Sequence, residues 1–199
     1  MYRTWIYRFA SYWLKTIIKK SLSSIVFFVF SPVFLKILSF SISMIHVVVL
    51  ADNFHHFQLP IQEYIKRTQS FLRFHTIAPS KLKNPWEIVD DEAKKLDKFF
   101  KNTALPRWHK IYLNIDAITY SSEGLSARQE KIFQHSAHIY YVIGGAYGLP
   151  KEFVASFFDE QWSLGQLTFP HSLAILVTLE QLYRAHEIQK WSKYHHGDI

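Results

Sequence analysis

The sequence contains no cysteine among its 199 residues. This absence excludes disulfides, thiolate metal sites, iron–sulfur clusters and cysteine nucleophiles, and it is compatible with a reducing compartment. Acidic residues are absent from the first 43 positions, which carry six Lys and Arg residues. The remaining 156 residues hold 17 basic and 16 acidic side chains, so almost all of the net charge of +7 belongs to the N-terminal segment. A basic net charge suggests a nucleic-acid or membrane partner, but any nucleic-acid contact by residues 44–199 has to come from a local basic patch.

Residues 1–43 also lack an apolar run long enough for a clear membrane span. Their longest uncharged stretch, residues 21–35, has 15 residues, whereas a span needs about 20. Three interpretations remain open: a signal anchor, a signal peptide with a poor cleavage site, or sequence translated ahead of a start at Met44. We favour the last, and we expect residues 1–43 to form no part of the core of a domain at residues 44–199.

From Met44 onward, short apolar runs alternate with segments of helical periodicity. Strands are predicted at residues 45–51, 73–78, 110–115, 138–143 and 161–167. Helices are predicted at residues 58–72, 90–102, 121–135 and 170–191, and the third of these is expected to be capped by Ser121 or Ser122. Residues 81–86, with the sequence KLKNPW, are predicted to form a loop. Strands that alternate with helices predict an α/β fold with a mostly parallel sheet flanked by helices.

Two glycines, Gly144 and Gly145, follow directly after a buried apolar run. Glycines at this position allow a sharp turn or the close approach of a ligand to the backbone. Residues 113–117 and 164–169 are expected at the same edge of the sheet, where ligands of parallel sheets bind. These three segments predict a pocket walled by main-chain amides and carbonyls, which suits a flat heterocycle such as adenine. The glycine spacing matches neither the dinucleotide-binding fingerprint nor a P-loop.

Three further residue groups have both a functional and a structural interpretation. His171, at the start of the last helix, is either a candidate base or a polar residue that begins a helix. Arg184 follows Glu180 by four positions, and a surface ion pair is a sufficient explanation of that spacing. The pair His195 and His196 lacks the spacing of a helical metal site, so we predict no metal.

Taken together, the motifs VIGGAYGL, WSLGQLTFPHS, EQLYRAHEI and the terminal YHH resemble the RlmH family. Members of that family are SPOUT-class methyltransferases that methylate N3 of a pseudouridine in the 23S ribosomal RNA of the large subunit. The resemblance covers Met44 to His195 and is strongest between Val142 and Arg184. It implies a C-terminal trefoil knot, S-adenosylmethionine as the cofactor, and a homodimer. It also implies a cytoplasmic enzyme that acts on the ribosome or its large subunit.

The resemblance assigns roles to individual positions. The residues that match the family's cofactor pocket are Leu113, Gly144, Leu164, Gly165, Gln166, Leu167, Thr168 and Phe169, and Gly144 is expected to leave room for the cofactor. The residues that match positions near the target base are His171, Arg184, Tyr194 and His195. We expect Arg184 to stabilise negative charge on the base, and His171 or His195 to take the proton from N3.

The sequence departs from the family pattern at three places. Ile175 replaces an arginine, Ala117 and Ile118 replace a Gly-Lys pair, and Asp52 replaces a glycine of the first turn. The loss of cations next to a polyanionic substrate predicts weaker RNA binding. We expect a divergent but active enzyme. The alternatives are a non-catalytic RNA-binding relative and a small membrane-anchored protein.

Overall fold

The computed structural model describes residues 43–103 and 108–190. These residues belong to one compact unit, Ser43–Ile199. The expected extension at residues 1–43 lies outside the described residues except for Ser43, so its separation from the core stays a prediction. Within the described ranges, no helix combines the length and the apolarity that crossing a bilayer requires.

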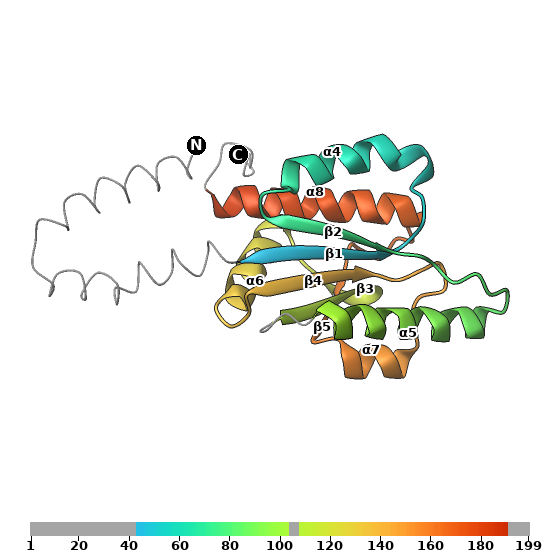
Figure 1. The fold of residues 1–199 in the computed structure, drawn as a ribbon. Helices are drawn as coiled ribbons and strands as arrows, with labels where there is room; N and C mark the ends of the chain where they lie inside the picture. The colour runs from blue at the N-terminus through green and yellow to red at the C-terminus, as the bar shows by residue number, and fades with distance from the viewer. Residues whose placement is uncertain (1–42, 104–107, 191–199) are drawn as a thin grey trace, which may run out of the picture. The chain divides into compact units, whose positions relative to one another are not determined.

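Five parallel strands form the centre of this unit in the spatial order β2-β1-β4-β3-β5 (Figure 1). They are β1 (Met44–Leu50), β2 (Leu72–Ile77), β3 (Trp108–Thr119), β4 (His138–Ile143) and β5 (Glu160–Ser163). β1 and β4 lie side by side inside the sheet, and Val47 pairs with Tyr141 in their register. Both strands are almost continuously buried because helices cover both faces of the sheet. The predicted α/β fold with a parallel sheet is confirmed.

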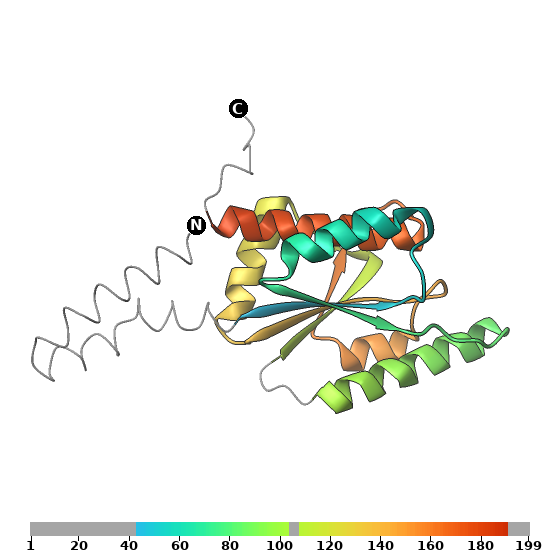
Figure 2. The same cartoon turned by 45° about the horizontal axis from the view of Figure 1, so that its top comes forward.

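The helices form a layer on each side of the sheet (Figures 1 and 2). One layer holds α4 (Gln58–Thr68) after the short 3-10 turn η1 (His55–Phe57), together with α6 (Ser122–Phe133) and α8 (His171–Gln189); the other holds α5 (Pro85–Thr103) and α7 (Lys151–Phe157). Side chains of β4 alternate between the two cores. Tyr141 and Ile143 pack on the side of α4, α6 and α8, whereas Tyr140 and Val142 pack on the side of α5 and α7. The trefoil knot implied by the family resemblance stays a prediction.

Two helix starts are set by capping side chains. Helix α5 begins at Pro85 and not at residue 90 as predicted. Proline fits a first helical turn, and Asn84 Oδ1 accepts a hydrogen bond from Trp86 N at 3.0 Å. Helix α6 is capped by Ser121, whose Oγ accepts a hydrogen bond from Gly124 N at 3.0 Å. The sequence predicted the start of α6 at Ser121 or Ser122. The earlier start of α5 makes that helix longer than predicted by more than one turn.

The apolar sequence of α8 is largely explained within one subunit. Ile175, Leu179 and Leu182 are fully buried in the core on the side of α4 and α6. The family resemblance implies a homodimer, in which a second copy of the chain could cover an apolar helix. Because the same chain already covers its most apolar residues, the composition of α8 is weak support for a dimer.

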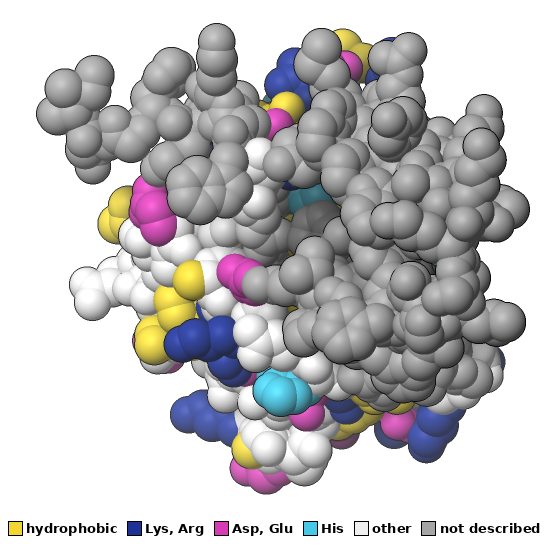
Figure 3. Space-filling view, turned by 90° about the vertical axis from the view of Figure 1, so that its left-hand side faces the viewer, with side chains coloured by type: hydrophobic (Ala, Val, Ile, Leu, Met, Phe, Trp, Pro, Cys, Tyr) yellow, Lys and Arg dark blue, Asp and Glu magenta, His cyan; other side chains and the backbone are white. Residues whose placement is uncertain are grey.

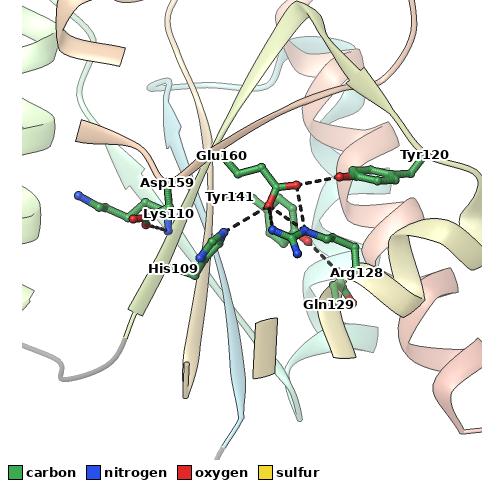
Figure 4. A network of polar contacts seen from close by, with 8 residues as sticks. All are labelled: His109, Lys110, Tyr120, Arg128, Gln129, Tyr141, Asp159 and Glu160. Atoms are coloured by element: carbon green, nitrogen blue, oxygen red, sulfur yellow. Dashed lines mark hydrogen bonds and ion pairs between the residues drawn. The ribbon is translucent and has the colours of Figure 1, made fainter. Parts of the chain in front are cut away.

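A charged network fixes the edge strand β5 to α6 (Figure 4). Glu160 accepts hydrogen bonds from Arg128 Nη2 at 2.6 Å and from Tyr120 Oη at 2.9 Å, and His109 Nε2 lies 3.3 Å from Glu160 Oε2. Burial alone raises the pKa of Glu160, but the hydrogen bonds from His109, Arg128 and Tyr120 outweigh burial and hold its pKa at about 2. The carboxylate is therefore ionised at neutral pH and ties the strand to the helix.

Three histidines form a chain of ring contacts across β2, β1 and β4. The Nδ1 atom of His46 lies 3.0 Å from His75 Nε2, and its Nε2 atom lies 3.1 Å from His138 Nδ1. The His46 ring also stacks on Tyr140, with ring centroids 4.2 Å apart. Burial is the main cause that lowers the pKa of His46 to about 3, and the two neighbouring histidines add to it. The folded protein therefore holds His46 in its neutral form.

The lowered pKa of His46 predicts a loss of stability in acid. Between pH 6.5 and 3 the unfolded chain protonates His46 and the folded chain does not, so stability falls as the pH drops through this window. This residue alone is expected to cost about 2 kcal/mol between pH 6.5 and 5. Urea unfolding at the two pH values should show that His46→Gln reduces the pH dependence by about this amount. His56→Gln, at an exposed position, is the control, and equal pH dependence in His46→Gln and wild type would contradict the assignment.

Candidate active site at the carboxyl ends of the strands

The three segments that were predicted to form a pocket meet at one edge of the sheet. Leu113 on β3 pairs with Trp162 on β5, two residues before Leu164. β4 lies on the other side of β3 and ends one residue before Gly144. β3 runs on to Thr119, past the end at residue 115 that the sequence predicted. Its pairing still places Leu113 beside the ends of β4 and β5, so Leu113, Gly144 and Leu164 lie close together, and their role in a pocket stays a prediction.

The space beside Gly144 is filled by the protein itself. A Cβ atom on Gly144 would lie 2.9 Å from Tyr112 Oη and 3.3 Å from Tyr112 Cε2. Burial raises the pKa of Tyr112 to about 12, so this phenol is neutral. Tyr112 therefore already favours a glycine at this position, and the expectation that Gly144 also leaves room for a cofactor stays a prediction.

Glu92 is a buried acid beside the glycine turn that the sequence did not single out. A Cβ atom on Gly145 would overlap both carboxylate oxygens of Glu92, which is 2% exposed. Glu92 Oε1 accepts a hydrogen bond from Ser80 N at 3.2 Å, and Oε2 has no partner in the described part of the chain. Burial raises the pKa of Glu92, and the amides of Ser80 and Gly145 oppose this. Its spacing of four from the buried Leu96 was the signal of an inward-facing position.

The loop after β5 is shaped by Ser163. Its Oγ accepts a hydrogen bond from Gly165 N at 3.1 Å and lies 3.0 Å from the carbonyl oxygen of Ile115, to which it can donate. Gly165 has a φ of 137°, a conformation that favours glycine, so β5 ends at Ser163 and not at residue 167 as predicted. The loop therefore presents both backbone and side chains at the edge: Leu164, Gly165 and Phe169 are half-buried, and Gln166, Leu167 and Thr168 are exposed.

His171 begins α8 and is fastened to the end of β1. Burial lowers the pKa of His171, and a hydrogen bond to the backbone of Leu50 offsets this only in part. Its Nε2 atom is buried and has no hydrogen-bond partner among the described residues. The imidazole is therefore neutral at pH 7 and keeps one nitrogen that can accept a proton. Both sequence interpretations, the helix start and the base, fit this geometry.

The other residues expected near the target base are not brought to His171 within the described chain. Arg184 lies 13 positions further along α8, which corresponds to about 20 Å along the helix axis. Its Nη2 atom lies 2.7 Å from Glu180 Oε1, so the predicted ion pair is present. Tyr194 and His195 lie outside the described residues.

The residues at the three places that depart from the family pattern add no positive charge to this edge of the sheet. Ile175 is fully buried in the core, and Asp52 is exposed just after β1. Ala117 lies in the part of β3 where the register against β5 shifts, between Leu113 and Ile118. In the described ranges, no group of three or more His, Asp or Glu side chains has an arrangement that could hold a metal ion.

Comparisons with known proteins identify the family. Residues 42–195 match the family model SPOUT_MTase, described as predicted SPOUT methyltransferase. A ribosomal RNA large subunit methyltransferase H from Mycoplasmopsis synoviae (strain 53) is 33% identical over 154 residues, which are 76% of this chain and 98% of that protein. The protein of the same name from Lysinibacillus sphaericus (strain C3-41) is 31% identical over 160 residues, which are 78% of this chain and 99% of that protein. On these matches, the chain belongs to the RlmH family of SPOUT methyltransferases.

Proposed function

We propose that this protein is a cytoplasmic enzyme that transfers a methyl group from S-adenosylmethionine to N3 of a pseudouridine in 23S ribosomal RNA. The observation that supports this best is the edge where Leu113, Gly144 and Leu164 meet. This edge lies inside residues 42–195, the region that matches the methyltransferase family. A pocket with main-chain walls at this edge would suit adenine.

The residues at this edge fit the cofactor. Gly148, in the loop after β4, and Gly165, in the loop after β5, have φ values of 72° and 137°. At these glycines no side chain covers the main chain of the loops. Leu113 and Leu164 are half-buried and offer an apolar surface for a flat ring. Leu167 is 72% exposed, an apolar side chain that a ligand bound in the loop would cover. S-adenosylmethionine, when bound, supplies a methyl group on a sulfonium, and this chemistry needs no covalent intermediate on the protein.

His171 and Arg184 supply the acid–base and electrostatic parts of the mechanism. N3 of a pseudouridine carries an imide proton and is a poor nucleophile until that proton leaves. The neutral His171 can accept the proton on Nε2. Arg184 stabilises the negative charge that develops on the carbonyl oxygens on either side of N3.

The spacing of these two residues supports a site that is shared between two subunits. Within one chain, about 20 Å of helix separates His171 from Arg184, and a single nucleobase cannot contact both. In a two-fold homodimer, Arg184 of the partner subunit can complete the site that contains His171.

The full chain is expected to methylate a stem-loop of large-subunit ribosomal RNA that contains pseudouridine. Labelled S-adenosylmethionine measures the transfer, and mass spectrometry of the digested RNA should identify 3-methylpseudouridine. The same stem-loop with uridine at that position is the control for the target base. A protein that binds both substrates and transfers no methyl group would instead be the non-catalytic relative.

Arg184→Ala is expected to lower the methylation rate about a hundredfold, because it removes a charge that acts on the developing anion. Cofactor affinity by calorimetry should be unchanged, and the lost ion pair should cost only about 0.3–0.5 kcal/mol of stability. Arg67→Ala is the matched control, since Arg67 forms the same type of pair with Glu63 on α4. Full activity of Arg184→Ala would leave Arg184 with the ion pair as its only role.

Mixing two inactive variants tests whether the site is shared. His171→Ala and Arg184→Ala subunits, exchanged in equal amounts, should recover about a quarter of wild-type activity. Half of the dimers are then mixed, and each mixed dimer has one site with both residues intact. Subunit exchange is verified by mass spectrometry. If activity does not recover, either both residues act in the site of one subunit or one of them has no role in the mechanism.

A further inference from the structure

The KLKNPW segment, residues 81–86, is exposed along its whole length. Trp86 is 83% exposed and Leu82 is 47% exposed. Residues 78–86 contain no acid, and Lys81 and Lys83 take part in none of the ion pairs in the described part of the chain. A tryptophan so far out of the core is unusual for a residue type that is mostly buried. The segment therefore combines two free cations with an open aromatic face.

The base of this segment is held firmly while its tip stays open. Lys95 Nζ donates a hydrogen bond to the carbonyl of Pro79 at 3.0 Å, and Glu92 accepts one from Ser80 N at 3.2 Å. Within the segment, Asn84 Oδ1 accepts a hydrogen bond from Trp86 N at 3.0 Å. The backbone at both ends of the segment is therefore held in place before any partner arrives, which lowers the entropic cost of binding.

The segment lies next to the candidate active site. Glu92 contacts Ser80 at the base of the segment and Gly145 in the glycine turn, so one side chain spans the distance between them. The loop after β2 and the start of α5 extend past the carboxyl ends of the strands (Figures 1 and 2). At the opposite end of the sheet, the visible Lys and Arg side chains lie among Asp and Glu side chains (Figure 3). The KLKNPW segment therefore places two lysines that form no ion pair in the described ranges beside the candidate active site.

We propose that the KLKNPW segment is an RNA-binding arm, in which Lys81 and Lys83 contact phosphates and Trp86 stacks on an unpaired base of the substrate. This inference rests on the proposed function and adds a substrate contact to it. Single-stranded RNA is bound by this combination of cations and an aromatic platform. A contact with a second protein copy fits less well, because protein interfaces are depleted in lysine.

The test measures binding of the full chain to the pseudouridine stem-loop by fluorescence anisotropy at several salt concentrations. The double variant Lys81→Gln/Lys83→Gln should reduce the slope of log affinity against log salt by about 1.4–1.8, which is the loss of two phosphate contacts. Trp86→Ala should weaken binding about tenfold or more at every salt concentration with the slope unchanged. Trp86→Phe, which keeps an aromatic face, should recover most of the affinity.

The control is Lys94→Gln/Lys98→Gln, which removes two exposed lysines from α5 at a distance from the segment. It has the same charge change as the test variant, so a merely general charge effect would reduce both slopes equally and overturn the proposal. Calorimetry with S-adenosylmethionine should give wild-type affinity for all variants, which verifies that the fold and the cofactor site are intact.

The remaining outcomes separate this inference from the proposed function. Wild-type RNA affinity and salt slope in the segment variants would overturn the RNA-binding arm and leave the methyltransferase proposal standing. A wild-type protein that binds neither the stem-loop nor S-adenosylmethionine would overturn both. Dissociation of a dimer by Trp86→Ala in sedimentation velocity would make the segment a subunit contact and would also overturn the proposal.

Discussion

The turn after β4 is fixed by two side chains that occupy the space where Gly144 and Gly145 have none. Tyr112 reaches it from β3, and Glu92 reaches it from α5. Both side chains are buried, and neither glycine can take a side chain without displacing one of them. The position of the turn is therefore set by the neighbouring strand β3 and by helix α5. The edge that holds the candidate site depends on this packing.

The loop after β5 is held by a different kind of interaction. Glu160 joins β5 to α6 through an ionised carboxylate, and Ser163 turns the chain directly afterwards. The removal of one partner from a half-buried charged network usually costs more than the network contributes as a whole. The two loops that are proposed to hold the cofactor therefore start from rigid points, one set by close packing and one by an ionic network. A pocket made of main chain needs such support, because backbone groups cannot reposition themselves as a flexible side chain can.

The sequence predicted the alternating strands and helices because their periodicities are local, and the parallel sheet follows from that alternation. The ion pair between Glu180 and Arg184 was also local, at one helical turn. The inward-facing position of Glu92 had a local signal in its spacing from Leu96, but its contact with Gly145, more than 50 residues away in the chain, had none. The contact between Tyr112 and Gly144 was hidden for the same reason, because the two residues are more than 30 positions apart in the chain. Nothing in the periodicity encodes a knot, so that feature came from resemblance alone.

Glu92 has a thermodynamic consequence because one carboxylate contacts both the arm and the turn. If bound RNA shifts the residues near Ser80, the contact between Glu92 and Gly145 changes as well. Thermodynamic linkage is reciprocal. If bound RNA changes the affinity for the cofactor by some factor, bound cofactor changes the affinity for RNA by the same factor. The two substrates of this protein would thus communicate through a buried acid that touches neither of them.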